Sequence, residues 1–229
     1  MFLFYNEIEE YANMIELVTF LGNPGREYER NRHNAGWLFA AQLPFYSSLD
    51  WRKKYQGNYA ALEGEKLKTF YGESSADSPS RFHFLKPETF MNSSGDAIHA
   101  AASFFKIPAE RILLVHDELE LPLGTVSLKF SGGLGGHNGL RSMRARFSTA
   151  DFWRLRIGIG RPDDRKSGQG GPAGSGKGIL EWVLSNFSAE EEAALAEVFS
   201  AIAPMLTGAL VEGPEKFLPA WAKKKIISG

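Results

Sequence analysis

Residues 17–37 read LVTFLGNPGREYERNRHNAGW, and this stretch decides the fold around it. Beta-branched and aromatic residues predict a buried strand over Ile15–Phe20. Asn23, Pro24 and Gly25 end that strand, because proline cannot donate to a strand ladder and glycine accepts turn conformations. Ligands of open α/β sheets bind at the carboxyl ends of the strands, so Asn23 is expected at the reactive edge of a sheet.

His33 follows this strand after a polar loop. An amide and an imidazole brought together at the carboxyl edge of a sheet form a candidate reaction centre. The alternative is a solvated or structurally hydrogen-bonded histidine, which is the more common state of a loop histidine. This stretch alone does not decide between the two.

Strands alternate with helices along the chain. Further strands are expected at Tyr59–Glu63, Lys66–Tyr71, Arg81–Leu85, Arg111–Val115, Thr125–Phe130 and, half-exposed, Arg154–Ile159. Helices are expected at His33–Leu43, from Ser93 or Ser94 to Phe105, at Asn138–Arg146, and after Ser188, where Ser188 and Glu191 form a capping box. The pattern predicts the α/β class: a single layered α/β/α domain with a mixed, mainly parallel twisted sheet.

With 229 residues, of which 43% are hydrophobic, the chain can bury one proper core. We expect one domain over residues 15–229, an N-terminal extension over residues 1–14, and a flexible glycine-rich insertion over residues 163–178. The absence of cysteine excludes disulfides, a thiol nucleophile and a cysteine-zinc site. It fits a reducing compartment, and we expect a cytoplasmic protein without a membrane-spanning segment.

The net charge of −1 does not itself indicate nucleic acid, because phosphate binding needs only a local basic surface. Two groups of arginines are candidates for such a surface: Arg26, Arg30 and Arg32 before His33, and Arg141 and Arg144, which are spaced to share a helix face. The alternative for each is a surface arginine that keeps the domain soluble. Lys223–Lys225 are expected to be a solvated helix end.

Two further segments extend the argument: KPETFMNSSGDAI at Lys86–Ile98 and HDELELPLGTVSLKFSGGLGGHNGLRSM at His116–Met143. Together with the first stretch they resemble bacterial-type peptidyl-tRNA hydrolase, from about Ile15 into the helix after Ser188. That family cleaves the ester between a peptide and the terminal ribose of tRNA. The resemblance implies peptidyl-tRNA as the substrate. We expect no cofactor and a monomer without an obligate protein partner. It departs from the family at Leu134, where a further histidine is often found.

Ester hydrolysis at neutral pH needs a base for water, a group that orients the base, and donors for the developing oxyanion. An imidazole titrates near neutral pH, so His33 suits the first role. Asp117, at the end of a strand, suits the second, because a carboxylate that accepts one imidazole N–H raises the basicity of the other nitrogen. The resemblance implies this pairing. The alternative for Asp117 is a helix or turn cap.

Three asparagines complete the set that the resemblance implies: Asn23, Asn92 and Asn138 hold the peptide end and the terminal nucleotide. Asn92 is the preferred oxyanion donor, and Asn23 the preferred contact that distinguishes a blocked amine from a free one. Tyr28 and Phe90 are expected to offer apolar and stacking surface. The alternative for Phe90 is a plain core aromatic.

His116 and His137 flank the expected site. Neither has the spacing of a metal motif, so we interpret both as structural neighbours and expect no metal.

Residues 171–178, GPAGSGKG, have the glycine and lysine spacing of a P-loop. Gly178 replaces the closing Ser or Thr, and no buried strand precedes the motif. Two other classes remain in competition with the esterase: a non-catalytic RNA-binding domain and an NTP-dependent protein. The esterase is favoured, because a binding module would not need His33, Asp117 and three asparagines at strand and loop ends.

Overall fold

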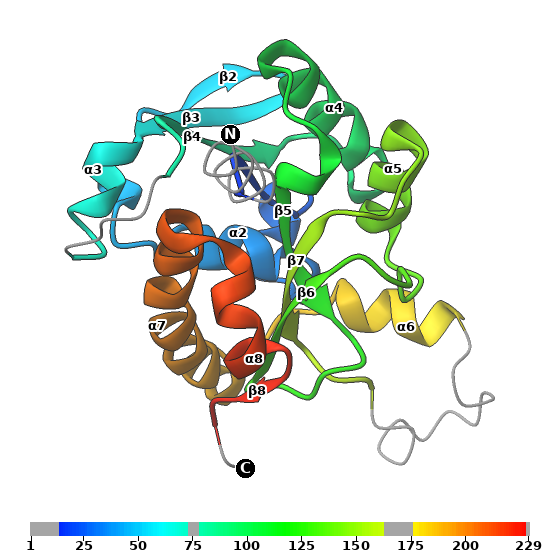
Figure 1. Ribbon diagram of the computed structural model, residues 1–229. Coiled ribbons are helices and arrows are strands. Elements are labelled where there is room, and N and C mark those ends of the chain that lie inside the picture. The colour runs from blue at the N-terminus through cyan, green and yellow to red at the C-terminus, as the bar shows by residue number, and fades with distance from the viewer. Residues whose placement is uncertain (1–13, 73–77, 163–175, 228–229) are drawn as a thin grey trace.

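The computed structural model describes residues 14–72, 78–162 and 176–227, and these residues form an eight-stranded sheet flanked by helices (Figure 1). The strands, in sheet order, are β2 Arg52–Lys54, β3 Gly57–Glu63, β4 Arg81–Pro87, β1 Leu17–Phe20, β5 Ile112–Glu118, β7 Trp153–Gly158, β6 Thr125–Phe130 and β8 Lys224–Lys225.

The four central strands, β4, β1, β5 and β7, are parallel, and the strands on both sides of them pair in antiparallel fashion. Phe20 lies opposite Val115, and Asp117 lies opposite Ile157. The carboxyl ends of β4, β1 and β5 therefore meet at one edge of the sheet. The predicted mixed sheet is confirmed, and its parallel part is the part that carries the candidate site.

Helices cover both faces of the sheet. They are α2 Ala35–Ala40, α3 Gly64–Lys68, α4 Ser94–Phe105, α5 Asn138–Phe147, α6 Gly176–Val183, α7 Ala189–Glu212 and α8 Leu218–Trp221. Short 3-10 turns are η1 Arg26–Tyr28, η2 Arg32–Asn34, η3 Tyr46–Ser48, η4 Met91–Ser93, η5 Ala109–Arg111 and η6 Pro214–Phe217. Helices α4 and α5 lie on one side of the sheet and α2 and α7 on the other (Figure 1).

Successive residues of the central strands point into two different cores, because side chains alternate along a strand. Val18 and Val115 pack in the same cluster as Phe39 of α2 and Phe199 of α7. The second cluster lies beneath α4 and α5 and contains Leu17, Leu114, Ile98 and Leu140. Two cores on two faces confirm the layered α/β/α arrangement.

Helix α7 begins with the predicted capping box: the Ser188 hydroxyl accepts from the Glu191 backbone N–H, and the Glu191 carboxylate accepts from that of Ser188. An apolar stripe along this helix, which consists of Leu195, Val198, Phe199 and Ile202, is buried. By length and composition alone α7 is long and apolar enough to cross a membrane, but 67% of its most apolar window is buried inside the protein. It is a core helix of this domain.

Two predicted elements are wrong. The strand expected at Lys66–Tyr71 is replaced by helix α3 and a turn. Glu65, Lys66 and Lys68 are good helix formers, and Leu67 is the one hydrophobic side chain that α3 buries. The helix end expected at Lys223–Lys225 contains the edge strand β8, in which Lys224 pairs with Val126. Lysine is common on edge strands because its charge discourages pairing with other molecules.

Strand β7 was expected to be half-exposed, and it is buried. It lies between β5 and β6, and the basic residues that suggested exposure are accommodated inside the protein: Arg154 is 2% exposed, and Arg156 pairs with Glu118. The predicted helix at His33–Leu43 is shorter, because it starts in η2 and α2 ends at Ala40.

The predicted extension falls almost entirely on residues 1–13, which lie outside the described residues. So do residues 163–175 of the predicted insertion. The remainder of that segment, residues 176–178, belongs to α6 and not to a loop.

His83 makes the stability of the fold depend on pH. Its ring stacks on Phe105 at 3.9 Å between centroids, and its Nδ1 atom accepts the Tyr59 hydroxyl at 2.7 Å. Burial, with the nearby Arg81, lowers the pKa of His83 to about 4. The unfolded chain therefore takes up this proton first, and the stabilisation present above pH 6.5 is lost as the pH falls towards 4.

We expect the free energy of unfolding to fall by up to about 2 kcal/mol through His83 between about pH 7 and pH 4.5. Urea unfolding at the two pH values, with and without His83→Gln, measures this contribution. The variant should lose less stability on acidification than the parent. Equal losses in both proteins would contradict the assignment.

Candidate active site

The loop that carries His33 is fastened to the end of β1 by Asn34. The Asn34 side chain accepts the Asn23 backbone N–H at 2.8 Å and donates to the Asn23 carbonyl at 3.1 Å. Asn31 caps the turn η2, because its side-chain oxygen accepts the Asn34 backbone N–H. These buried contacts place the His33 imidazole at the carboxyl edge of the sheet.

Two of the loop arginines hold the same loop against α7. Arg32 is buried, pairs with Glu191 at 2.9 Å, and lies 3.9 Å from the centre of the Trp182 ring. Arg30 pairs with Glu192 at 2.6 Å. Arg32 therefore suits neither the predicted phosphate contact nor the alternative of a solubilising surface arginine, because its charge is paired inside the fold. Arg26 is exposed.

Gly36 lets α2 approach the sheet closely enough to bring His33 to β5. A methyl group at Gly36 would lie 2.5 Å from the Val115 carbonyl oxygen and 2.7 Å from that of Leu21. We expect Gly36→Ala to lower the free energy of unfolding by up to about 3 kcal/mol and to lower kcat, because the helix must move and His33 moves with it. Denaturant unfolding and single-turnover kinetics measure the two effects. The exposed Ala41→Ser, at the end of the same helix, is the control and should change neither; a Gly36→Ala protein with unchanged kcat would contradict this role.

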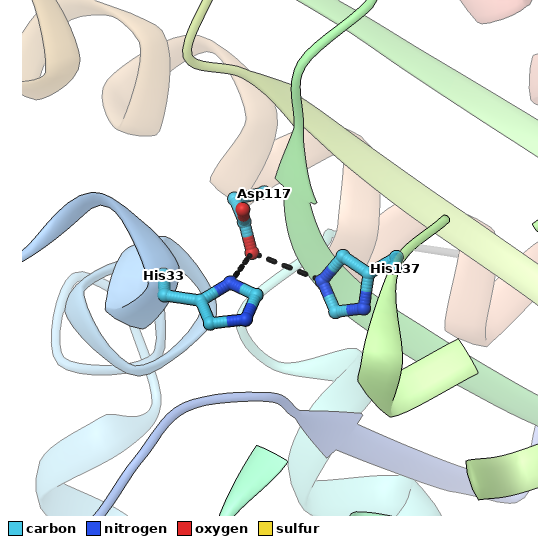
Figure 2. A group of neighbouring side chains, drawn as sticks. All are labelled: His33, Asp117 and His137. Carbon is cyan, nitrogen blue, oxygen red and sulfur yellow. Dashed lines mark hydrogen bonds and ion pairs between the residues drawn. The ribbon is translucent and has the colours of Figure 1, made fainter. Parts of the chain in front are cut away.

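Asp117 lies at the end of β5 and receives two imidazoles on one oxygen (Figure 2). Its Oδ1 atom is 2.8 Å from Nδ1 of His33 and 3.0 Å from Nε2 of His137. The carboxylate is 2% exposed. An ionised carboxylate only accepts, so both imidazoles donate to it. Nε2 of His33 is left on the opposite side of the ring, available to take a proton (Figure 2).

His137 has its tautomer fixed by α5. Its Nδ1 atom accepts the backbone N–H of Gly139 at 3.1 Å and that of Leu140 at 3.4 Å, so it caps the helix. An accepting Nδ1 in a neutral imidazole requires the proton to be on Nε2, which is the atom that faces Asp117. His137 therefore joins the start of α5 to the buried carboxylate.

The electrostatics of this cluster favour a basic His33. Burial lowers the pKa of His33, but the charge and hydrogen bond of Asp117 outweigh burial and raise that pKa above 6.5. Burial alone would raise the pKa of the Asp117 carboxyl, and the two imidazoles lower it far below its ordinary value. Asp117 is thus ionised at neutral pH, and it stabilises an imidazolium on His33.

His116 lies behind His137 and stays neutral. Burial, followed by the neighbouring His137, lowers the pKa of His116 far below its ordinary value. Its Nδ1 atom donates to the Asp117 backbone carbonyl at 2.6 Å. This contact fits the structural role that the sequence suggested for His116.

The three predicted asparagines lie in segments that contact one another through Met91 and Gly139. The Asn23 side-chain oxygen accepts the Met91 backbone N–H at 2.8 Å, and Asn92 follows Met91 in η4. Gly139 packs against Met91, and a methyl group there would lie 2.7 Å from the Met91 sulfur. Asn138 precedes Gly139 at the start of α5. Asn23 is buried at the floor of the site, whereas Asn92 and Asn138 are exposed at its rim.

Tyr28 and Phe90 meet at the same rim. Their rings are 6.5 Å apart between centroids and perpendicular, and Phe90 is 59% exposed. Phe90 is therefore not the plain core aromatic of the alternative interpretation. The pair presents an apolar surface next to Asn92.

Sequence reasoning missed Asn34 and underestimated His137. Asn34 directly follows His33, and its role was invisible because it depends on the return of the loop to the end of β1. For His137, a signal existed in its position one residue before a predicted helix, where a side chain that caps the helix is common. The contact with Asp117 follows only from the packing of α5 against the sheet.

His33, Asp117 and His137 also form a group of metal-ligand types, with ligand atoms within 4.8 Å of one another. A metal would need a lone pair on Nε2 of His137. That atom carries the proton, because Nδ1 accepts from α5. The donor set therefore fits a carboxylate held by two N–H groups better than it fits a metal.

Comparisons with known proteins place the chain in one family. The family model for peptidyl-tRNA hydrolase matches residues 17–228. A peptidyl-tRNA hydrolase from Treponema pallidum is 44% identical over 93% of this chain and 98% of its own length, and one from Neisseria gonorrhoeae is 41% identical over 86% and 93%. The crystal structure of peptidyl-tRNA hydrolase from Acinetobacter baumannii superposes with a TM-score of 0.72 at 31% identity, over 89% of this chain and 92% of that chain. Sequence, fold and the family match over nearly the whole described chain agree, and the protein belongs to the peptidyl-tRNA hydrolase family.

Proposed function

We propose that the protein cleaves the ester bond between the peptide and the 3′-terminal ribose of peptidyl-tRNA by attack of a water molecule that His33 deprotonates. As a member of its family the protein is a hydrolase of peptidyl-tRNA. The products are a free peptide and a free tRNA. The proposal concerns which groups of this chain perform the reaction.

The observation that carries the proposal is the 2.8 Å contact between Nδ1 of His33 and Asp117. It fixes the tautomer of His33 and leaves Nε2 as the basic atom. Water gives one proton to Nε2, and its oxygen attacks the ester carbonyl carbon. The imidazolium then returns the proton to the leaving ribose oxygen, so that His33 ends the cycle neutral.

The asparagines supply uncharged hydrogen-bonding groups around this base. We assign the oxyanion to the Asn92 amide, which is exposed at the rim of the site and follows the residue that Asn23 binds. Asn23 uses its oxygen on Met91, which leaves its amide N–H₂ for the substrate carbonyls next to a blocked amine. We assign the terminal nucleotide to Asn138 and the Tyr28–Phe90 surface, since a base can stack on exposed aromatic rings.

Contacts with tRNA phosphates are proposed for Arg141 and Arg144 of α5. Both are exposed, and within the described residues neither forms an ion pair, in contrast to Arg146, which pairs with Asp96. We propose further that residues 15–229 form one domain that acts as a monomer in the cytoplasm.

The two competing classes lack comparable support. A non-catalytic RNA-binding domain gives no reason for a buried carboxylate with two imidazole donors. For an NTPase, the glycine-rich segment needs a strand directly before it, and the preceding described strand, β7, ends at Gly158. Lys177→Ala should leave hydrolysis unchanged.

The deciding experiment compares N-acetylaminoacyl-tRNA with free aminoacyl-tRNA as substrates of the intact protein without added nucleotide or metal. We expect rapid release of tRNA from the blocked substrate alone. Asn23→Asp keeps the size of the side chain and removes its amide donors, so it should reduce the preference for the blocked substrate. Equal cleavage of both substrates by the intact protein would refute the proposed selectivity, and no cleavage of either would refute the reaction.

A further inference from the structure

Arg154 is a fully buried arginine without a carboxylate partner among the described residues. It lies on β7, one residue from Trp153 and opposite Leu114 of β5, and is 2% exposed. Burial of an unpaired charge is unfavourable unless other polar groups solvate it. Something in the surrounding structure must therefore compensate for this charge.

The compensation comes from backbone carbonyls of the glycine-rich loop at residues 131–136. Nη1 of Arg154 donates to the Gly133 carbonyl at 2.6 Å, and Nη2 donates to those of Gly132 at 2.9 Å and Ala150 at 3.3 Å. The guanidinium also lies 4.7 Å from the centre of the Phe152 ring. Only the planar fork of arginine reaches adjacent carbonyls in this way, whereas the lysine ammonium is a point charge.

The loop itself contains little that would fix its shape. Ser131, Gly132, Gly135 and Gly136 all have positive φ, so its backbone follows no strand or helix. At its start the Ser131 backbone N–H donates to the Phe152 carbonyl. At its end the His137 backbone N–H donates to the Leu134 carbonyl at 2.9 Å. Between these two anchors, Arg154 is, among the residues that the structure describes, the side chain that hydrogen-bonds to the loop backbone.

The end of this loop is the start of the reaction centre. His137 follows Gly136 directly and donates to Asp117, and Asn138 is the next residue. A movement of the loop that carries His137 with it changes the distance from His137 to Asp117, and hence the share of the carboxylate charge that His33 experiences. Three titratable side chains surround His33. Asp117 is in hydrogen-bonding contact with it, His137 lies 5.0 Å away between ring centroids, and His116 lies behind His137.

We infer that Arg154 is a positioning residue for the hydrolysis, which acts by holding the glycine-rich loop so that His137 keeps its hydrogen bond to Asp117 and Asn138 keeps its place at the rim. The inference rests on the proposed roles of His33 and Asp117. Arg154 itself hydrogen-bonds to the loop, and the loop leads into His137, which contacts Asp117.

The cleanest test is Arg154→Lys, which keeps the charge and loses the fork. We expect kcat to fall roughly tenfold or more, because a catalytic group displaced by about 1 Å loses much of its effect. The pKa of His33, followed by NMR titration of its ring, should rise, since a loosened His137 shares less of the Asp117 charge. Arg154→Met removes both charge and fork, and it should lower kcat further.

Arg111→Lys is the matched control. Arg111 is a half-buried arginine at the opposite edge of the sheet, where it donates to the Met14 carbonyl and pairs with Glu16. The Arg111→Lys protein should be less stable than the parent, without any change in kcat or in the pKa of His33. Circular dichroism and urea unfolding establish that each variant is folded at the temperature of the assay, and if Arg154→Met does not fold, Arg154→Lys carries the test.

A folded Arg154→Lys protein with the parent kcat and the parent His33 titration would overturn the inference. So would a shift of equal size in Arg111→Lys, because the effect would then be a general loss of structure. The NMR titration needs no turnover, so it still reports on Arg154 if His33→Ala shows that His33 is not the base. Failure of the proposed function and failure of this inference are therefore distinguishable.

Discussion

Replacing His33 by alanine is expected to lower kcat for N-acetylaminoacyl-tRNA by about a hundredfold or more. The change removes the group that takes the proton from water, and general base catalysis typically contributes a factor of this size. The value of KM should change little, because the surface of Tyr28, Phe90 and the asparagines that we propose for binding stays in place. Single-turnover hydrolysis at saturating enzyme measures the chemical step directly.

The matched control is His99→Ala. His99 is an exposed histidine on α4, whose hydrogen-bond contact is with Ser103 of the same helix. It should leave kcat unchanged, and circular dichroism should show the parent fold for both variants. A folded His33→Ala protein with more than about a tenth of the parent kcat would exclude His33 as the base.

Asp117→Asn is expected to have the second large effect, again at least about a hundredfold on kcat. Asparagine keeps the shape and one accepting oxygen, so the two imidazoles still find a partner, but the negative charge is gone. The imidazolium that forms on His33 in the transition state then has no counter-charge in a buried site. The loss should therefore appear in kcat rather than in KM.

The pH dependence of this variant follows from the same charges. In the parent protein Asp117 outweighs burial and raises the pKa of His33 above 6.5. In Asp117→Asn only burial remains, so the pKa of His33 should fall below 6.5, and the acidic limb of the kcat/KM profile should move to lower pH. The rate at every pH should nevertheless be lower than in the parent. An acidic limb that stays in place, or moves to higher pH, would contradict the pairing of His33 with Asp117.

Stability should change in the same variant. The depressed pKa of Asp117 stabilises the folded protein above the ordinary carboxyl pKa, and this stabilisation is lost as the pH falls through the acid range. Asp117→Asn removes that dependence. Acid unfolding of the variant should consequently be less steep than that of the parent.

The sequence alone predicts the helices and strands in which apolar residues recur at regular spacing. Strands β1, β4, β5 and β6 and helices α4, α5 and α7 are predicted because each buries an apolar face of regular spacing. The pairing of His33 with Asp117 is implied by the family resemblance, and the strand pattern alone does not predict it. The structure brings the two side chains into hydrogen-bonding contact.

The parts that were not predictable depend on contacts between distant segments. Arg154 looks like an exposed residue in an alternating strand, and only the return of residues 131–133 towards β7 supplies the carbonyls that allow its burial. Strand β8 has only two residues, which is too short to show an alternation of apolar and polar side chains. It forms because it pairs with the free edge of β6. For α3, one buried leucine was not enough to distinguish a helix from a strand.

The ion pairs of the His33 loop with α7 set an order of events during synthesis. Arg30 and Arg32 are made early, whereas their partners Glu192 and Glu191 lie about 160 positions later along the chain, at the start of a helix that must itself be capped. The nascent chain therefore carries His33 on a loop that lacks these two ion pairs until α7 has emerged. An enzyme whose substrate is peptidyl-tRNA is itself a peptidyl-tRNA while it is being translated, and its site is completed only near the end of that period.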